Sequence, residues 1–295
     1  MMKIQIAKVW LALLAPLTLL ACGGGGGAPS VSTMGATTVM YGRTMSVTVN
    51  GSSLLSTELS MIVEGPCGPV TKSTGPTDLQ QVFTCTVTGI GDLIPRIRTP
   101  EGVELASLRL NVPLPQVAMT VTQGTRSGTY VLELDQVAAP ITVDNFLAYV
   151  RAAFYTSTLF HRVEAGFVVQ AGGYIAGPTP KAATRPAITS ESKNGLKNLR
   201  GTVAMARTAD PNSATAQFFI NLVDNPALDF GSAENPDGYT VFGKVVAGFN
   251  SAGASIPGMD VVDEIGKVTV TDTGTSGLTH LPTSNIVITS VNQIK

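Results

Sequence analysis

Short stretches in which apolar and polar residues alternate recur along most of this chain, and glycine or proline separates one stretch from the next. "RTMSVTVNG" and "QVFTCTV" are two examples. This period of two is typical of β-strands, because successive side chains of a strand point to opposite faces of a sheet. Charged residues make up 13% of the chain, against roughly 25% in an average protein, so long charged helices are not expected. The sequence therefore predicts a mainly β protein with many turns.

The length and charge of the chain limit its organisation and its partners. Its 295 residues are enough for about two domains. The formal net charge is −1 and no basic run or stripe is present, which argues against nucleic acid as a partner.

The N-terminal residues have the features of an export signal. Lys3 and Lys8 supply positive charge, and residues 9–20 form an apolar run. This run is shorter than the roughly 20 residues that a membrane-spanning helix needs. Residues 1–21 are therefore predicted to be a secretory signal peptide.

The end of this signal, "LLAC" at residues 19–22, is similar to the lipobox of bacterial lipoproteins. That resemblance implies cleavage before Cys22, a lipid on its thiol, and a glycine-rich tether over residues 22–30. Gly23 after the cysteine resembles outer-membrane sorting, so the expected location is the outer membrane of a bacterial cell envelope, facing the periplasm. The alternative is an ordinary signal peptide that leaves Cys22 free.

Two further cysteines remain, Cys67 and Cys85. Because an exported protein meets an oxidising compartment, these two are predicted to form a disulfide bond. The alternative is a pair of buried free thiols. A zinc site is not expected, because no histidine lies in this region.

Residues 31–115 are predicted to form a small immunoglobulin-like β-sandwich. Four alternating stretches lie there between glycine- and proline-bearing turns, a spacing typical of such domains. The region carries no carboxylate pair, Ser–His set or metal-ligating cluster, which favours a spacer or a binding module without chemistry. The two prolines of "NVPLPQ", residues 111–116, mark the predicted boundary to a second domain over residues 117–295.

The second domain is predicted to combine many strands with two helices. Thr142 is the expected N-cap of a helix within residues 139–155, and Gly266 is expected to end a shorter one. The many strands and few helices indicate a closed barrel whose ends the helices cover. The buried stripe of the first helix follows i, i+3, i+4, i+7 spacing: Val143, Phe146, Leu147 and Val150.

Several polar residues lie among the predicted strands of this domain. Without further comparison, a strand arginine such as Arg162 is more often solvated or ion-paired than catalytic, and Glu164 is an available partner for it. Phe167 and Phe219 are more often core residues than pocket residues. The local pattern alone therefore leaves the role of these side chains open.

Three blocks of this domain occur in a characteristic order: "FHRVEAGFVVQAGG", "GTVAMARTADPNSATAQFFINL" and "GYTVFGKV". Together they resemble the cyclophilin-type peptidyl-prolyl cis-trans isomerases, and most closely the bacterial periplasmic branch. The similarity covers nearly all of residues 117–295 and none of the N-terminal domain. It implies an eight-stranded antiparallel barrel capped by two helices, and an enzyme that isomerises X-Pro bonds in exported proteins.

The resemblance also implies a catalytic residue and a substrate pocket. Arg162 matches the catalytic arginine, whose guanidinium would donate a hydrogen bond to the prolyl nitrogen once the amide is twisted. No metal, cofactor or nucleophile is required, and no cofactor is expected. The expected substrate-binding residues are His161, Phe167, Val168, Gln170, Ala206, Arg207, Phe219, Leu228 and Tyr239.

The expected partners are proline-containing segments of exported proteins and, through the lipid on Cys22, a membrane. The chain is expected to be monomeric. Two other functions remain open: binding of proline peptides without catalysis, and a surface lipoprotein whose N-terminal domain does the biological work.

The chain departs from the family pattern in a few places. Glu164 and Ala165 occupy positions where Ile-Pro is common, and Val168 stands where many members have methionine. Residues 248–258 look like an insertion of unknown purpose.

Overall fold

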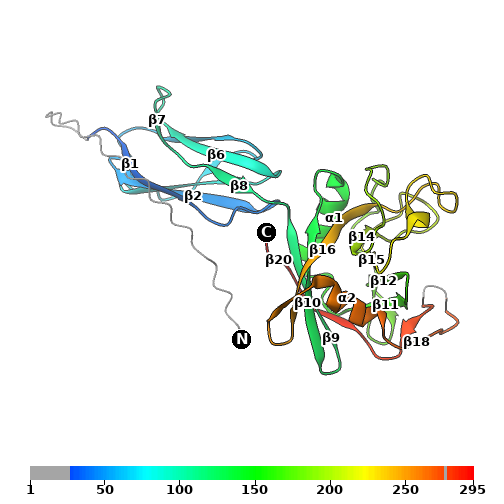
Figure 1. Cartoon of the computed structure of the whole chain (residues 1–295). Helices are drawn as coiled ribbons and strands as arrows, with labels where there is room; N and C mark the ends of the chain where they lie inside the picture. The colour runs from blue at the N-terminus through cyan, green and yellow to red at the C-terminus, as the bar shows by residue number, and fades with distance from the viewer. Residues whose placement is uncertain (1–26, 276–277) are drawn as a thin grey trace. The chain divides into compact units, whose positions relative to one another are not determined.

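The computed structural model of the chain describes residues 27–275 and 278–295 (Figure 1). Contacts divide the chain into two compact units, residues 1–113 and 114–295. The predicted signal peptide, Cys22 and most of the predicted tether lie outside the described residues. Within the described ranges, no helix is long and apolar enough to cross a membrane.

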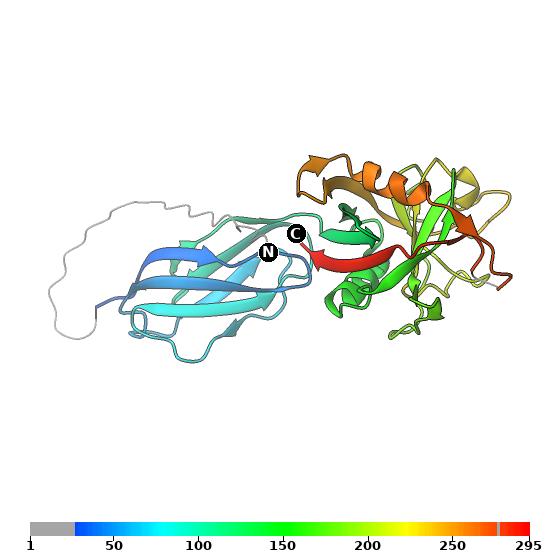
Figure 2. The same ribbon diagram turned by 90° about the horizontal axis from the view of Figure 1, so that it is seen from below.

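The N-terminal unit is built from two antiparallel sheets (Figure 2). The strand order is β1-β2-β5-β4 in one sheet and β3-β6-β7 in the other, where β8 also pairs with β6. Numbered along the chain, these are the A-B-E-D and C-F-G sheets of an immunoglobulin constant-type sandwich, the fold predicted for this region. The strands are β1 (Ser30–Ala36), β2 (Thr44–Ser52), β3 (Ser60–Glu64), β4 (Thr71–Lys72), β5 (Gln80–Thr86), β6 (Gly91–Arg98), β7 (Glu104–Ser107) and β8 (Leu110–Val112).

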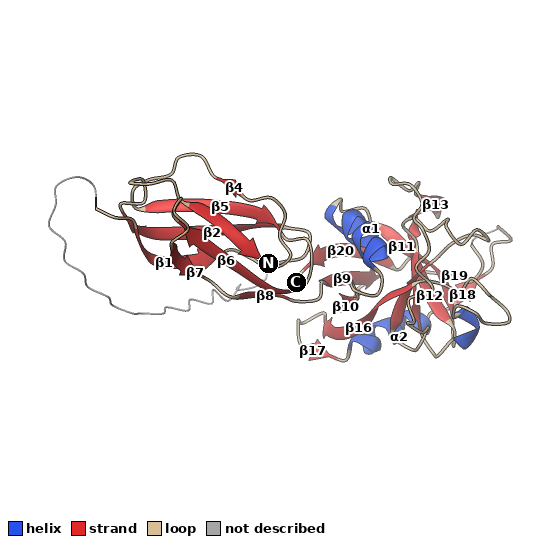
Figure 3. Ribbon diagram, turned by 90° about the horizontal axis from the view of Figure 1, so that it is seen from above, coloured by secondary structure: helices blue, strands red, loops and turns tan. Residues whose placement is uncertain are grey.

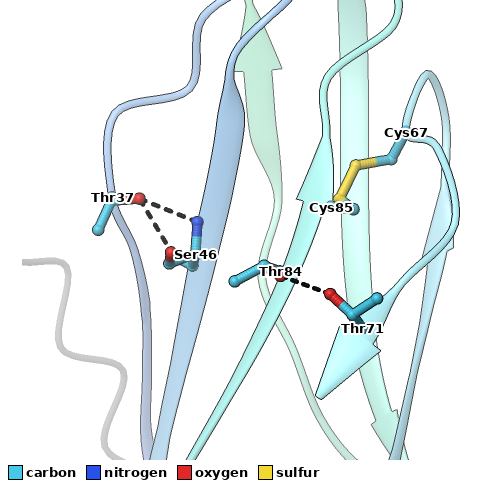
Figure 4. The surroundings of a disulfide bond; sticks show 6 residues. All are labelled: Thr37, Ser46, Cys67, Thr71, Thr84 and Cys85. Atoms are coloured by element: carbon cyan, nitrogen blue, oxygen red, sulfur yellow. Dashed lines mark hydrogen bonds between the residues drawn. A yellow bond between two sulfur atoms is a disulfide. The ribbon is translucent and has the colours of Figure 1, made fainter. Parts of the chain in front are cut away.

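The predicted disulfide bond is present in this unit. Cys85 lies in β5 and Cys67 in the segment between β3 and β4, with their Cα atoms 6.0 Å apart (Figure 4). Beside the disulfide, the Oγ1 atoms of Thr71 and Thr84 hydrogen-bond at 2.7 Å. Closure of a loop of this size stabilises the folded state by about 3 kcal/mol in the chain-entropy model. The disulfide thus joins the segment before β4 to β5, the strand with which β4 pairs.

The C-terminal unit is a closed antiparallel barrel of eight strands. The order is β10-β9-β20-β11-β12-β15-β14-β16, and pairing of β16 with β10 closes the circle. This confirms the fold that the resemblance implied. The barrel strands are β9 (Gln116–Gln123), β10 (Arg126–Leu134), β11 (Thr158–Glu164), β12 (Val168–Ile175), β14 (Thr202–Met205), β15 (Phe218–Asn221), β16 (Val241–Asn250) and β20 (Val287–Gln293). Shorter elements are β13 (Thr179–Pro180), β17 (Ser255–Ile256), β18 (Val270–Thr271), β19 (Leu281–Pro282) and the 3₁₀ turn η1 (Pro226–Leu228).

Two α-helices, α1 (Pro140–Arg151) and α2 (Gly258–Gly266), lie on opposite sides of the barrel (Figures 1 and 3). The four residues of the predicted stripe on α1 are all buried. The ring of Phe146 packs 5.5 Å from Phe218 of β15 and 5.1 Å from Phe242 of β16, measured between ring centroids. The helix ends at Arg151, four residues before the end of the predicted span. It therefore covers the barrel with three turns, whose apolar face enters the core.

The prediction that Thr142 caps α1 is wrong. The N-cap is Ala139, and Pro140 begins the helix because its fixed φ suits the first helical position. Thr142 lies inside the first turn, where the carboxylate of Glu191 accepts hydrogen bonds from the backbone N–H of Ile141 at 3.0 Å and of Thr142 at 2.8 Å. The Thr142 hydroxyl donates to the same carboxylate at 2.7 Å. A residue about 50 positions away therefore supplies the cap.

Replacing Glu191 with alanine is expected to lower the free energy of unfolding of the barrel by about 1–2 kcal/mol, because two backbone donors lose their acceptor and the helix N-terminus loses its negative charge. Glu191→Gln keeps an acceptor oxygen and should lose less. Urea titrations of the three chains measure the difference. Equal midpoints for the native chain and the alanine variant would contradict this account of the cap.

Residues 248–258, which the sequence marked as an insertion, extend β16 and turn back as a short hairpin. Gly248 pairs with Ile256 and Phe249 with Ser255. The hairpin leads into α2 at Gly258, where an added Cβ would lie 2.4 Å from the carbonyl oxygen of Ala247. Only glycine allows α2 to begin this close to β16.

Candidate active site

A small pocket of about 100 Å³ opens on the side of the barrel. It gathers nine of the ten residues that the sequence assigned to catalysis and substrate binding. They come from six separate places in the chain, five of them in or beside barrel strands. The lining residues are Arg162, Phe167, Val168, Gln170, Ala206, Arg207, Phe219, Leu228 and Tyr239.

The register of the barrel strands brings the central residues together. Arg162 of β11 pairs with Gln170 of β12, and Gln170 pairs with Phe219 of β15. Side chains at directly paired positions lie on the same face of a sheet. The three side chains therefore form a row across three neighbouring strands, which no single stretch of sequence could provide.

The floor of the pocket is apolar. Val168 and Phe219 are buried and pack with Ala204 and Val241 beneath them. The ring of Tyr239 meets that of Phe219 edge-on, with centroids 5.5 Å apart. Well-packed apolar walls of this kind favour a small apolar group over water.

Arg162, the predicted catalytic residue, lines the pocket with its guanidinium. Its Nη2 donates a hydrogen bond to Oε2 of Glu164, and the two side chains form an ion pair. Its Cζ atom lies 5.7 Å from the centre of the Phe167 ring. Arg162 is thus ion-paired, as the local pattern suggested, and also part of the pocket wall.

Gln170 is held from behind by a residue that the sequence reading missed. Its Nε2 donates to Oε1 of Gln217 at 2.9 Å. Gln217 lies two residues before Phe219, so alternation along the strand places both on one face. That spacing was the available signal for Gln217.

Arg207 forms the other charged part of the wall. Its Nε donates to the carbonyl oxygen of Gly238 at 3.0 Å and its Nη2 to Oδ1 of Asn235 at 2.7 Å. Its Cζ lies 4.6 Å from the centre of the Tyr239 ring, a cation–π contact. Arg207 and Asn235, another residue not predicted, therefore fix the segment that carries Tyr239.

His161 is the one predicted residue that does not line the pocket. It lies at an irregularity in the pairing of β11 with β12, between Phe160, which pairs with Ala171, and Arg162, which pairs with Gln170. Its ring is buried, 4.6 Å from the ring of Tyr174 between centroids. Burial lowers the pKa of His161 to about 4, although the Leu159 backbone and the Gln217 side chain favour its charged form. Its place behind the pocket is that of a neutral core residue.

Comparison with known proteins places this site in a family. Residues 117–293 match the family model described as cyclophilin type peptidyl-prolyl cis-trans isomerase/CLD. The chain is 48% identical to peptidyl-prolyl cis-trans isomerase B of Escherichia coli (strain K12) over 173 residues, which covers 58% of this chain and 97% of that protein. It is 45% identical to peptidyl-prolyl cis-trans isomerase A of Dickeya dadantii (strain 3937) over 171 residues, or 58% of this chain and 82% of that protein.

The matched region is the whole barrel, from β9 to the end of β20. It contains all nine residues of the pocket and leaves the N-terminal sandwich outside. The family model covers more than half of the 295 residues. The chain therefore belongs to the family of cyclophilin-type peptidyl-prolyl cis-trans isomerases.

Proposed function

We propose that the barrel accelerates rotation about X-Pro bonds by holding the proline in the pocket while Arg162 donates a hydrogen bond to the prolyl nitrogen. The observation that carries this proposal is the position of Arg162, whose guanidinium lines the same pocket as the apolar floor of Val168 and Phe219. A cavity of about 100 Å³ suits a five-membered ring better than a large side chain.

The chemistry follows from the amide bond itself. Resonance makes the barrier to rotation about 18–20 kcal/mol. Twisting the bond breaks the conjugation, and the prolyl nitrogen becomes pyramidal and regains its lone pair. A guanidinium N–H can donate to that lone pair, which the planar amide does not offer. The interaction therefore stabilises the transition state more than the substrate, which is the condition for catalysis.

Arginine suits this task better than lysine or histidine. Its guanidinium stays protonated at any physiological pH and presents a planar set of donors. Gln170, whose Nε2 donates a hydrogen bond to Gln217, would use its other N–H to donate to a carbonyl oxygen of the bound peptide. Together these groups would hold the peptide while one bond turns, without a covalent intermediate.

The test is the catalysed exchange of an Ala-Pro peptide between its cis and trans forms, followed by NMR exchange spectroscopy. The native chain should increase the exchange rate, and Arg162→Ala should lose most of that increase. A peptide that binds without any change in exchange rate would instead support a proline-binding module. Equal rates for both chains would remove the proposed role of Arg162.

We further propose that the substrates are proline-containing segments of exported proteins, and that the enzyme is held at the outer membrane by a lipid on Cys22. The signal-like residues 1–21, the lipobox-like residues 19–22 and the disulfide of the N-terminal unit all support an oxidising compartment outside the cytoplasm. The sandwich would then separate the barrel from the membrane.

Replacing Cys22 with serine is expected to move the protein from the membrane fraction to the soluble fraction of the cell envelope, because the thiol that carries the lipid is lost. Cell fractionation followed by immunoblotting measures the change. Cys85→Ser, which removes a thiol from the predicted disulfide alone, should stay with the membrane. A native chain found in the soluble fraction would contradict the proposed anchor.

A further inference from the structure

The neighbour of Arg162 on the same strand face is a carboxylate. Arg162 and Glu164 are two residues apart on β11, so their side chains project from the same side of the sheet. Across the ladder, Arg162 pairs with Gln170 and Glu164 with Val168. Glu164 therefore lies beside the row of Arg162, Gln170 and Phe219, opposite Val168, which lines the pocket.

The ion pair holds the guanidinium without closing the pocket. Glu164 is not among the residues that line the cavity, whereas Arg162 is. The side chains of both are only partly exposed, at 25% for Arg162 and 34% for Glu164, so bulk water screens the pair less than it would on an open surface. The hydrogen bond uses one Nη2 donor out of the five N–H groups of a guanidinium. Donors therefore remain for a substrate.

The contact with Phe167 fixes the other side of the group. The guanidinium carbon lies 5.7 Å from the centre of the Phe167 ring, which itself lines the pocket. The carboxylate on one side and the ring on the other restrict a long side chain that would otherwise sample many rotamers. Orientation of this kind contributes to catalysis when the reacting group must meet its partner in one geometry.

We infer that Glu164 is a positioning residue for this isomerase: it orients the Arg162 guanidinium so that a free N–H faces the prolyl nitrogen. The inference rests on the proposed role of Arg162, through which Glu164 acts. Glu164 touches neither the substrate nor the reacting bond. Its loss should leave the pocket intact and release the arginine.

The test uses Glu164→Gln in the full-length chain, which keeps size and shape but removes the charge. The value of kcat/KM for an Ala-Pro peptide should fall about fivefold, the rate equivalent of the upper range measured for partly exposed ion pairs. The fall should lie in kcat, with KM unchanged, because the pocket still binds the ring. The matched control is Glu264→Gln, which removes the ion pair between Glu264 of α2 and Lys267 just after the helix, neither of which lines the pocket, and should leave the rate unchanged.

A double-mutant cycle separates this inference from the proposal on which it rests. In an Arg162→Ala background, Glu164→Gln should have no further effect, because the residue it orients is absent. The Nε–Hε NMR signal of Arg162, assigned by its loss in Arg162→Ala, should also show faster side-chain motion in Glu164→Gln.

Each outcome decides between the two statements. If Arg162→Ala lowers the rate but Glu164→Gln leaves it equal or raises it, the positioning role is overturned, and a raised rate would mean that the carboxylate restrains the arginine. If Glu164→Gln still lowers the rate when Arg162 is already alanine, Glu164 does not act through Arg162. If Arg162→Ala itself keeps the native rate, the proposed mechanism is overturned instead.

Discussion

Arg162→Ala is expected to lower kcat/KM for isomerisation of an Ala-Pro peptide by about 10- to 150-fold. A hydrogen bond from a charged donor contributes roughly 1.5–3 kcal/mol, and each 1.4 kcal/mol changes a rate by about tenfold. The alanine variant leaves the floor of Val168 and Phe219 in place, so the peptide can still bind. The residual activity would come from the pocket and from Gln170.

The distribution of this loss between kcat and KM tests the mechanism more sharply than its size. A donor that meets its acceptor only in the twisted state should lower kcat and leave KM nearly unchanged. Arg162→Lys keeps the charge but loses the planar set of donors, so it should fall between the native chain and the alanine variant. Arg126→Ala, at the start of β10 and outside this pocket, is the control and should keep the native rate. A loss confined to KM would make Arg162 a binding residue.

Much of the fold could be predicted from sequence because it depends on local periodicity. The alternation of β2 is visible in "RTMSVTVNG", and Met45, Val47 and Val49 are indeed fully buried. The buried stripe of α1 was equally clear from its spacing. The closure of the barrel depends instead on the pairing of β10 with β16, more than 100 residues apart, and only the family resemblance could supply it.

The details that sequence reasoning missed are contacts between distant residues. Glu191 caps α1 from about 50 residues away. Thr142 was the local candidate for the N-cap, but it lies inside the first turn of the helix. Asn235 supports the pocket through a side-chain hydrogen bond to Arg207 that no spacing rule encodes, whereas the position of Gln217 two residues before Phe219 was a signal in the sequence. His161, which the family motif also assigned to the site, is buried and does not line the pocket. Family motifs therefore predicted the pocket wall, whereas the residues behind that wall required the structure.

His161 is expected to make the stability of the barrel depend on pH. Its pKa is about 4 in the folded chain, mainly because burial disfavours the charged ring, against 6.5 for the ordinary side chain. Above pH 6.5 the ring is neutral in both states and contributes no pH dependence. Between pH 6.5 and 4 the unfolded chain binds a proton that the folded chain does not. The free energy of unfolding therefore decreases as the pH is lowered through this range. The total loss is about 3 kcal/mol, at roughly 1.4 kcal/mol for each unit of pKa shift.

His161→Gln should remove this part of the pH dependence, whatever its effect at neutral pH. The measurement is the free energy of unfolding from urea titrations between pH 7 and pH 4, followed by hydrogen exchange of β11 and β12 so that only the barrel is observed. The control is Val163→Ala, which removes buried apolar contacts from the same strand without a titrating group and should keep the native slope. Carboxylates elsewhere contribute equally to all three chains. If the free energy of unfolding depends on pH in the same way for the native and His161→Gln chains, the prediction is wrong. The ring would then bind its proton in the folded state as readily as in the unfolded state.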